Sequence, residues 1–172
     1  MLLRDLRTSI ELVVNGYQFP DIGSDDQPED PESWDSNWLI IHGTVTTGEG
    51  SPWSFQQPCL TTWEVAELAD WFQNVAAGLT PPLPPEAREP DKASSYAPAG
   101  WLTFTEPNLS FGVGAQSEAR VQLLICLSHE LAQPPLDVQR PTTSRITIET
   151  TPQQTQDAAA ALQEYLATFP AR

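Results

Sequence analysis

Prolines and carboxylates gather in three stretches of this 172-residue chain and limit where helices and strands can form. The stretch at about 20–36 is acidic, whereas those at about 79–100 and 131–143 are rich in proline. Because proline lacks a backbone N–H and breaks helices and central strands, we expect all three stretches to be loops. The short strands on either side of residues 79–100 do not look self-sufficient, so a single domain, 1–172, is predicted.

Apolar periodicity predicts several strands between these loops. Residues 8–14 alternate between apolar and polar side chains, which is typical of a strand with one buried face. Residues 37–47 (NWLIIHGTVTT) are apolar on both faces, so we expect a central strand that is covered on both sides. A short partner strand with Trp53 and Phe55 follows as the second half of a hairpin. Four more strands are expected near 101–106, 108–114, 119–128 and 144–150.

Two segments have helical periodicity. In residues 60–78, Thr61 and Glu64 match a capping box and Gly78 can end the helix. A second helix is expected to begin at Thr151-Pro152. The order β-β-β-α-β-β-β-β-α shows no alternation of single strands and helices, so we predict an α+β fold with a mainly antiparallel sheet of about six to seven strands and two amphipathic helices packed on it. Their expected apolar stripes are Val65, Leu68, Phe72, Val75, Ala76 and Leu79 in the first helix, and Ala158, Leu162, Tyr165, Leu166 and Phe169 in the second.

The charge of the chain is large and unevenly distributed. The formal net charge is −15, and residues 8–87 contain no Lys or Arg. Such a field repels nucleic acids and anionic membranes and attracts basic molecules, so we expect a basic protein partner, no nucleic acid and no membrane. The same charge could serve solubility alone, which is the competing interpretation.

Eleven residues are candidates for contact with a basic partner. Trp63 lies opposite the apolar stripe of its helix, beside Glu67 and Asp70, and an exposed Trp among carboxylates would be a good anchor for cations. The alternative is that Trp63 folds back onto the preceding chain, because most Trp side chains are buried. The candidates are Asp21, Asp25, Asp26, Glu29, Asp30, Glu32, Trp34 and Asp35 in the acidic loop, with Trp63, Glu67 and Asp70 in the helix.

The two cysteines indicate a reducing environment. Cys59 and Cys126 are far apart and match no metal-binding spacing, so we expect two buried thiols rather than a disulfide or a zinc site. No apolar segment is long enough to span a bilayer, and the first residues break their apolar run with charges at once. We therefore predict a cytoplasmic protein.

No motif in the chain indicates catalysis or a cofactor. His42 and His129 are the only histidines, and nothing supplies the rest of a catalytic triad. The glycines form no phosphate-binding loop, so we expect no catalytic residue, no cofactor and no metal site. A calcium site in the acidic loop is a weaker alternative, because its carboxylates lack the order of a calcium-binding loop. It would use Asp21, Asp25, Asp26 and Asp30.

The stretch TFTEPNLSF, residues 103–111, contains an acid that invites a catalytic interpretation. The apolar alternation changes parity at Pro107-Asn108, as it would across a two-residue loop. However, proline disfavours the usual two-residue hairpin turns. The alternative is therefore a bulged or wider loop. In both cases we expect Glu106 to point inward, with backbone N–H groups bound to its carboxylate. We interpret Glu106, Pro107 and Asn108 as a structural corner. The two-residue loop would pair Glu106 with Leu109, Phe104 with Phe111 and Leu102 with Val113.

Five pieces of the sequence together resemble a known family. In their order and spacing they are similar to bacterial immunity proteins of the WapI family, with variable loops at 22–33 and 80–99. The resemblance implies a small cytoplasmic protein that binds and blocks the C-terminal toxin domain of a polymorphic toxin, often a nuclease, and it implies no catalytic residue. The pieces are GYQFPD (16–21), WDSNWLIIHG (34–43), WSFQQPCLTTWEVAELADW (53–71), FTEPNLSF (104–111) and Pro134-Pro135.

The sequence thus favours an immunity protein that binds its toxin through an acidic surface. The alternative is a small-ligand-binding or enzymatic domain with a site near Glu106, His129 and Glu130, which a deep pocket joining these residues would support. Sequence patterns leave the oligomeric state and the identity of the partner open.

Overall fold

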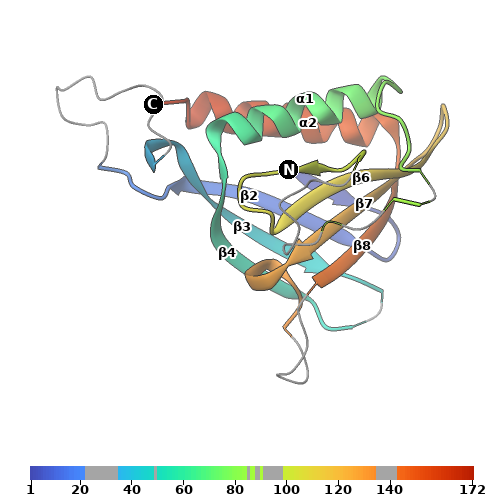
Figure 1. Cartoon of the computed structure of the whole chain (residues 1–172), viewed down its shortest axis with the longest axis horizontal. Coiled ribbons are helices and arrows are strands. Elements are labelled where there is room, and N and C mark those ends of the chain that lie inside the picture. The colour runs from blue at the N-terminus through green and yellow to red at the C-terminus, as the bar shows by residue number, and fades with distance from the viewer. Residues whose placement is uncertain (22–34, 49, 85, 88–89, 91–98, 135–142) are drawn as a thin grey trace.

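The structure is a computed structural model of the whole chain, and it describes residues 1–21, 35–48, 50–84, 86–87, 90, 99–134 and 143–172. These residues form strands, two α-helices and two short 3-10 helices (Figure 1). In chain order the elements are β1 (Leu2–Arg4), β2 (Ser9–Tyr17), η1 (Asp35–Asn37), β3 (Trp38–Thr46), β4 (Trp53–Thr61), α1 (Thr62–Ala76), β5 (Leu102–Thr103), β6 (Leu109–Gln116), β7 (Val121–Ser128), η2 (His129–Leu131), β8 (Thr143–Thr150) and α2 (Pro152–Thr168).

The strands form two antiparallel sheets. One sheet has the order β1-β2-β3-β4 and the other β5-β6-β7-β8, and every paired strand in both sheets is antiparallel. The predicted α+β class is confirmed, with eight strands in two sheets where six to seven strands in one sheet were expected. The strand that the sequence did not predict is β1, which has only three residues.

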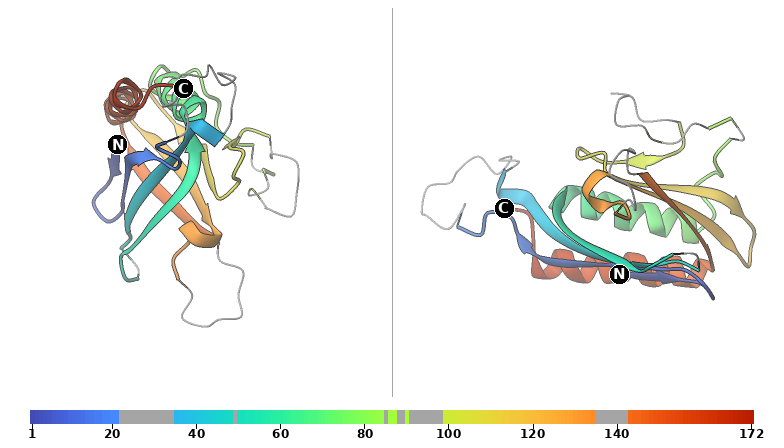
Figure 2. Two further views of the ribbon diagram at one scale, coloured as in Figure 1. Left: turned by 90° about the vertical axis from the view of Figure 1, so that its left-hand side faces the viewer. Right: turned by 90° about the horizontal axis from the view of Figure 1, so that it is seen from below.

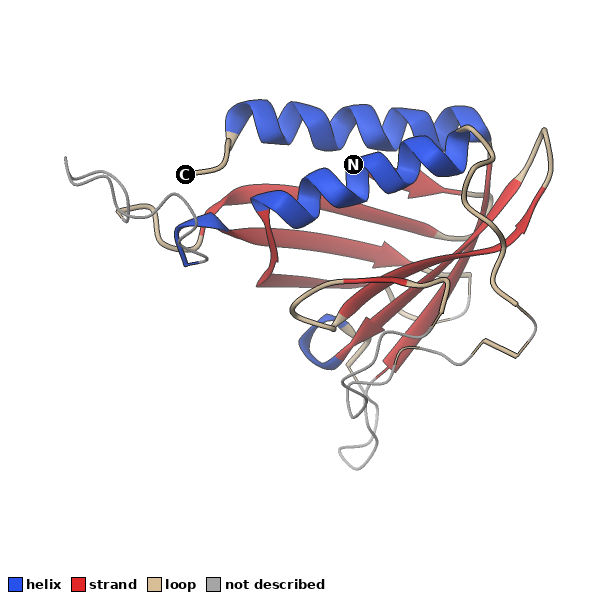
Figure 3. Cartoon of the chain, turned by 45° about the horizontal axis from the view of Figure 1, so that its top comes forward, coloured by secondary structure: helices blue, strands red, loops and turns tan. Residues whose placement is uncertain are grey.

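The two helices lie side by side on one side of the molecule. Figures 1 and 3 show α1 and α2 as a layer over the strands, and in Figure 2 (left) the strands of the two sheets cross beneath them. The helices run in opposite directions, so α1 begins at the end of the molecule where α2 finishes (Figure 1). Both predicted caps are present, at Thr61 with Glu64 and at Thr151 with Pro152 as the first helical residue. No helix in the described ranges is long and apolar enough to cross a membrane.

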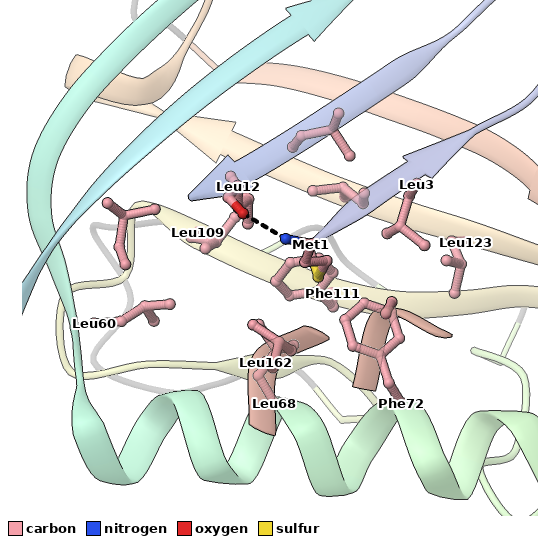
Figure 4. Close-up of a cluster of buried hydrophobic side chains, with 14 of the residues drawn as sticks. Met1, Leu3, Leu12, Leu60, Leu68, Phe72, Leu109, Phe111, Leu123 and Leu162 are labelled. Atoms are coloured by element: carbon pink, nitrogen blue, oxygen red, sulfur yellow. Dashed lines mark hydrogen bonds between the residues drawn. The ribbon is translucent and has the colours of Figure 1, made fainter. Parts of the chain in front are cut away.

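Both sheets and both helices contribute to one hydrophobic core. Leu12 from the first sheet, Phe111 from the second, Phe72 from α1 and Leu162 from α2 point into the same space (Figure 4). The core requires a glycine at position 43, because a Cβ there would lie 2.1 Å from the ring of Phe55 on the paired strand. The glycine thus allows an aromatic ring to lie across the backbone of the neighbouring strand.

A smaller apolar cluster covers the outer face of the second sheet. Trp101, Leu124 and Cys126 form it, and Leu83 packs against them from the proline-rich stretch. The backbone N–H of Leu83 donates to the carbonyl of Val113 over 2.7 Å. The described part of this stretch is therefore held against the sheet.

Both cysteines are buried, as predicted, and they form no disulfide with each other. Burial raises the pKa of Cys59 to about 12, and the negative charges of Glu64 and Glu106 add to this shift. Because the thiolate is the reactive form, Cys59 is held in its inert state.

Two details of the predicted packing are wrong. On β3, Leu39, Ile41 and Val45 are buried as expected, but the face with Trp38 and Ile40 is only half-buried, so this central strand is fully covered on one side alone. The prediction that Leu79 belongs to the buried stripe of α1 is also wrong, because Leu79 lies beyond the end of the helix and is 71% exposed. Helical periodicity applies only while the chain remains helical.

The loop before β6 is wider than a two-residue hairpin turn. The observed pairs are Leu102 with Phe111 and Thr103 with Ser110, so the predicted pairing of Leu102 with Val113 and of Phe104 with Phe111 is wrong. The wider loop, which was the alternative, spans residues 104–108. Its end is held by Ser128, whose N–H donates to the Asn108 carbonyl over 2.9 Å and whose hydroxyl donates to the Pro107 carbonyl over 3.3 Å.

A carboxylate joins the two sheets where β1 lies beside β8. One oxygen of Asp5 accepts hydrogen bonds from the N–H groups of Arg7 and Thr8, at 2.7 and 2.8 Å, and the other accepts from the N–H of Glu149 at 3.1 Å. Burial of the carboxyl group opposes its ionisation, but these N–H groups outweigh that effect and lower the pKa of Asp5. The ionised form is therefore the one that the fold stabilises.

Replacing Asp5 with Asn should lower the free energy of unfolding at pH 7 by about 1 kcal/mol, allowing for solvent screening of a surface carboxylate. Because the folded pKa is lowered, this contribution is complete above the unfolded pKa of about 4 and is lost as the pH falls through the folded pKa. Urea unfolding at a series of pH values should show the difference from the parent protein shrinking below about pH 4. Asp157→Asn, an exposed acid on α2, is the control, and an equal loss in both variants would contradict the role of Asp5.

Candidate functional site

The start of α1 is held by a buried carboxylate. One oxygen of Glu64 accepts hydrogen bonds from the N–H and the hydroxyl of Thr61, at 2.8 and 3.0 Å, which completes the capping box. The other oxygen accepts from the N–H of Thr105, in the loop before β6, at 2.6 Å. Glu64 therefore fixes the helix start to the second sheet as well as to β4.

Three of the predicted partner-binding residues form one exposed stripe on α1. Trp63, Glu67 and Asp70 are spaced at i, i+4 and i+7, which places them on one side of the helix, and all three are exposed. Trp63 keeps 37% of its surface exposed, so part of its ring is open to solvent while the greater part of the side chain is covered by the fold. Burial raises the pKa of Glu67, and the negative charge of Glu64 adds to this shift.

The two described ends of the acidic stretch lie at the same end of the molecule as this stripe. Asp21 and Asp35 are both exposed. Asp35 belongs to η1, and the buried Asn37 of η1 accepts a 2.8 Å hydrogen bond from the hydroxyl of Thr62, the first residue of α1. The predicted residues Asp25, Asp26, Glu29, Asp30, Glu32 and Trp34 lie outside the described residues.

Asn37 also binds the end of the chain. Its side-chain oxygen accepts from the N–H of Arg172 at 2.9 Å, and its amide nitrogen donates to the Arg172 carbonyl at 3.0 Å. The guanidinium of Arg172 lies 3.5 Å from the ring centroid of Tyr17 and donates to the carbonyl of Pro20 at 3.0 Å. These contacts connect η1, the end of β2 and the start of α1, so the described residues on either side of the acidic stretch lie close to the start of α1.

We call this region the acidic end, defined by Asp21, Asp35, Trp63, Glu67 and Asp70. The sequence did not single out Phe19, which is 38% exposed two residues before Asp21 and adds an apolar side chain to this region. Its only signal in the sequence was its place in the GYQFPD piece. No local pattern marked Asn37 or Arg172, because they meet across 135 positions of the chain.

The expectation for Glu106 is partly wrong. Glu106 lies in the predicted corner, but it is only half-buried, and its carboxylate makes no hydrogen bond with any described residue. Glu64, at the start of α1, is the acid that accepts a backbone hydrogen bond from this loop, from the N–H of Thr105. Asn108 is the buried member of the corner, and its side-chain oxygen has no hydrogen-bond partner in the part of the chain that the structure describes.

The alternative site would need a deep pocket that joins Glu106, His129 and Glu130. His129 and Glu130 are exposed at the end of β7, Glu106 is half-buried, and none of the three lines the cavities beside Arg4, Gln73 or Thr47. His129 has a positive φ of 54°, which fits its place at a sharp change of direction into η2. The described ranges also contain no group of three His, Cys, Asp or Glu side chains that could hold a metal ion.

Sequence comparison identifies the family of the chain. A sequence model of the WapI-like immunity protein family matches residues 1–170. The chain belongs to this family. Membership supports an immunity function and the non-enzymatic role that is typical of such proteins. No match was found among curated protein sequences.

Replacing Glu64 with Gln should destabilise this WapI-like protein by about 1–3 kcal/mol, because one of the N–H groups of Thr61 and Thr105 would then face an amide NH₂ instead of an acceptor. Urea unfolding at pH 7 measures the loss. Glu67→Gln is the matched control on the same helix. It should leave stability unchanged or slightly raised, since the raised pKa of Glu67 means that its charged form is disfavoured in the folded state. Equal effects of the two substitutions would show that Glu64 has no special role.

Proposed function

We propose that this protein neutralises a bacterial toxin by binding the toxin's C-terminal domain through the acidic end. The observation that carries the proposal is the exposed stripe of Trp63, Glu67 and Asp70 beside the two ends of the acidic stretch, in a chain that belongs to a family of immunity proteins. Protein interfaces are anchored by a few aromatic and charged residues, and Trp is among the most frequent. The proposal needs no catalytic group in the chain, and it places the protein in the cytoplasm.

The charge of the acidic end favours a basic partner. A carboxylate surface speeds association with a cationic surface and aligns the two partners before contact. A nuclease domain has such a cationic surface, because it must attract the phosphates of its substrate. An inhibitor with the opposite charge would cover the surface that the nucleic acid needs, so we propose a basic nuclease as the class of toxin.

The Trp63 ring supplies the apolar part of the proposed contact. Its exposed side can pack against an arginine or lysine side chain of the toxin, because the face of an indole ring attracts cations. Glu67 and Asp70 then lie one and two turns further along the helix, where they can pair with neighbouring cations. The fold holds this stripe rigidly through Glu64, so little order has to be gained on binding.

The test measures binding to the C-terminal domain of the toxin encoded beside this protein. The double variant Glu67→Lys/Asp70→Lys should weaken binding at least tenfold, mainly by slowing association, and it should flatten the dependence of the association rate on salt. Trp63→Ala should weaken binding at least tenfold, mainly by speeding dissociation. Surface plasmon resonance at several salt concentrations separates the two effects.

The control is Glu118→Lys/Asp157→Lys, which changes the net charge equally with exposed acids outside the acidic end. It should reduce association much less than the α1 variant, and all variants should unfold at temperatures close to that of the parent protein. Reversal of Asp25, Asp26, Glu29 and Asp30 tests the acidic loop in the same assay. If the α1 variants and the control bind equally, the acidic end is not the binding surface.

A further inference from the structure

Three of the five arginines in the described ranges gather at the end of the molecule opposite the acidic end. The chain has eight Lys and Arg residues, and those within the described ranges are Arg4, Arg7, Arg120, Arg145 and Arg172, of which Arg172 lies at the acidic end. Arg4, Arg7 and Arg120 line one surface cavity of about 710 Å³. The cavity lies where β8 leads into α2, whereas α1 begins at the other end of the molecule (Figure 1). We call it the arginine cavity.

Three separate parts of the chain meet at the arginine cavity. Residues 4–8, from the end of β1 through the turn to β2, form one wall, Ala119 and Arg120 before β7 form another, and residues 149–151 with Gln154 form the third. Hydrogen bonds hold each wall. Asp5 binds the first wall to Glu149, the N–H of Arg120 donates to the Ser117 hydroxyl at 3.1 Å, and the Thr150 hydroxyl donates to Gln154 at 2.8 Å. The backbone that carries the three arginines is therefore fixed in advance.

The positive charges in this cavity are only partly neutralised by neighbouring carboxylates. The guanidinium groups of Arg4 and Arg120 make no hydrogen bond or ion pair with any described residue, and Arg7 has the charge of Asp5 beside it. The cavity has two carboxylates, and both already accept hydrogen bonds, Asp5 from backbone N–H groups and Glu149 from the side chain of Gln122 at 2.7 Å. Three cations against two anions leave its lining positive in a protein whose net charge is −15.

We propose that the arginine cavity binds a small molecule that carries several phosphate groups. Guanidinium groups bind phosphate oxygens in pairs, and arginines from two different sheets can approach one ligand from two sides. The cavity volume falls within the range of sites for small ligands. Leu6 is fully exposed on the same wall and offers an apolar surface to the remainder of the ligand. The proposal does not depend on the toxin-binding function, because it uses none of the residues of the acidic end.

A ligand in this cavity would connect the two sheets. Arg4 and Arg7 belong to the β1–β2 side and Arg120 to the β6–β7 side, so a phosphate chain bound to all three would bridge them. Binding to the folded state alone stabilises it by mass action. At a concentration ten times its Kd, the ligand should raise the Tm by about 3–6 °C.

Pyrophosphate and ATP, without added metal ions, are suitable probes for calorimetric titration and thermal unfolding at constant ionic strength. We expect both to bind and to raise the Tm, with inorganic phosphate much weaker because it can reach fewer of the three arginines. Equal stabilisation by sodium chloride and by pyrophosphate at matched ionic strength would overturn the proposal. Binding of an Asp- and Glu-rich peptide without binding of either phosphate compound would also overturn it, and would assign the cavity to an acidic protein segment.

Single substitutions locate the site. Arg4→Gln and Arg120→Gln should each weaken pyrophosphate binding about tenfold or more, while the Tm without ligand stays near that of the parent protein because both side chains are exposed. Arg145→Gln is the control, since it removes the same charge from a neighbouring cavity that does not include Arg4 or Arg120. Binding that all three substitutions weaken equally would reflect net charge rather than a site, and would refute the assignment.

Discussion

The fold depends on the buried carboxylate of Glu64. Burying an unpaired acid would cost several kcal/mol, so its oxygens must receive donors, and here they come from both Thr61 and Thr105. This requirement ties the end of β4, the first turn of α1 and the loop before β6 into one unit. The same helix carries Trp63, Glu67 and Asp70 on its exposed side. The direction in which Trp63, Glu67 and Asp70 face therefore depends on the hydrogen bonds that Glu64 makes on a neighbouring side of the same helix.

The net charge of −15 is distributed unevenly between two ends of the molecule. The acidic end lies where α1 begins, and the arginine cavity lies where α2 begins. The 15 residues of α1 extend about 22 Å. This exceeds the Debye length of about 8 Å at physiological salt, so charges at the two ends are largely screened from each other. The proposed toxin contact and the proposed anion site therefore need not compete.

Elements with long, regular periodicity were predicted well, whereas the short connections were not. The 15 residues of α1 and the nine of β2 showed their period clearly, and the capping box was visible as Thr61 and Glu64 three residues apart. The strand β1 was missed because three residues show no period. The corner was recognised, but its register and the role of Glu106 were wrong. Parity along a strand reports which side chains share a face, but it does not report how many residues a loop contains.

The sequence by itself determined the α+β class, the helix caps, the family and the acidic character of one region, because these depend on local spacing and composition. Only the tertiary structure decided which acid is buried with donors, how Asn37 holds Arg172 across 135 positions, and that three arginines share one cavity. The physical reason is that a hydrogen bond or a cluster of charges depends on distance in space. Residues that come into contact only when the sheets pack together leave no local sequence pattern from which the contact could be predicted.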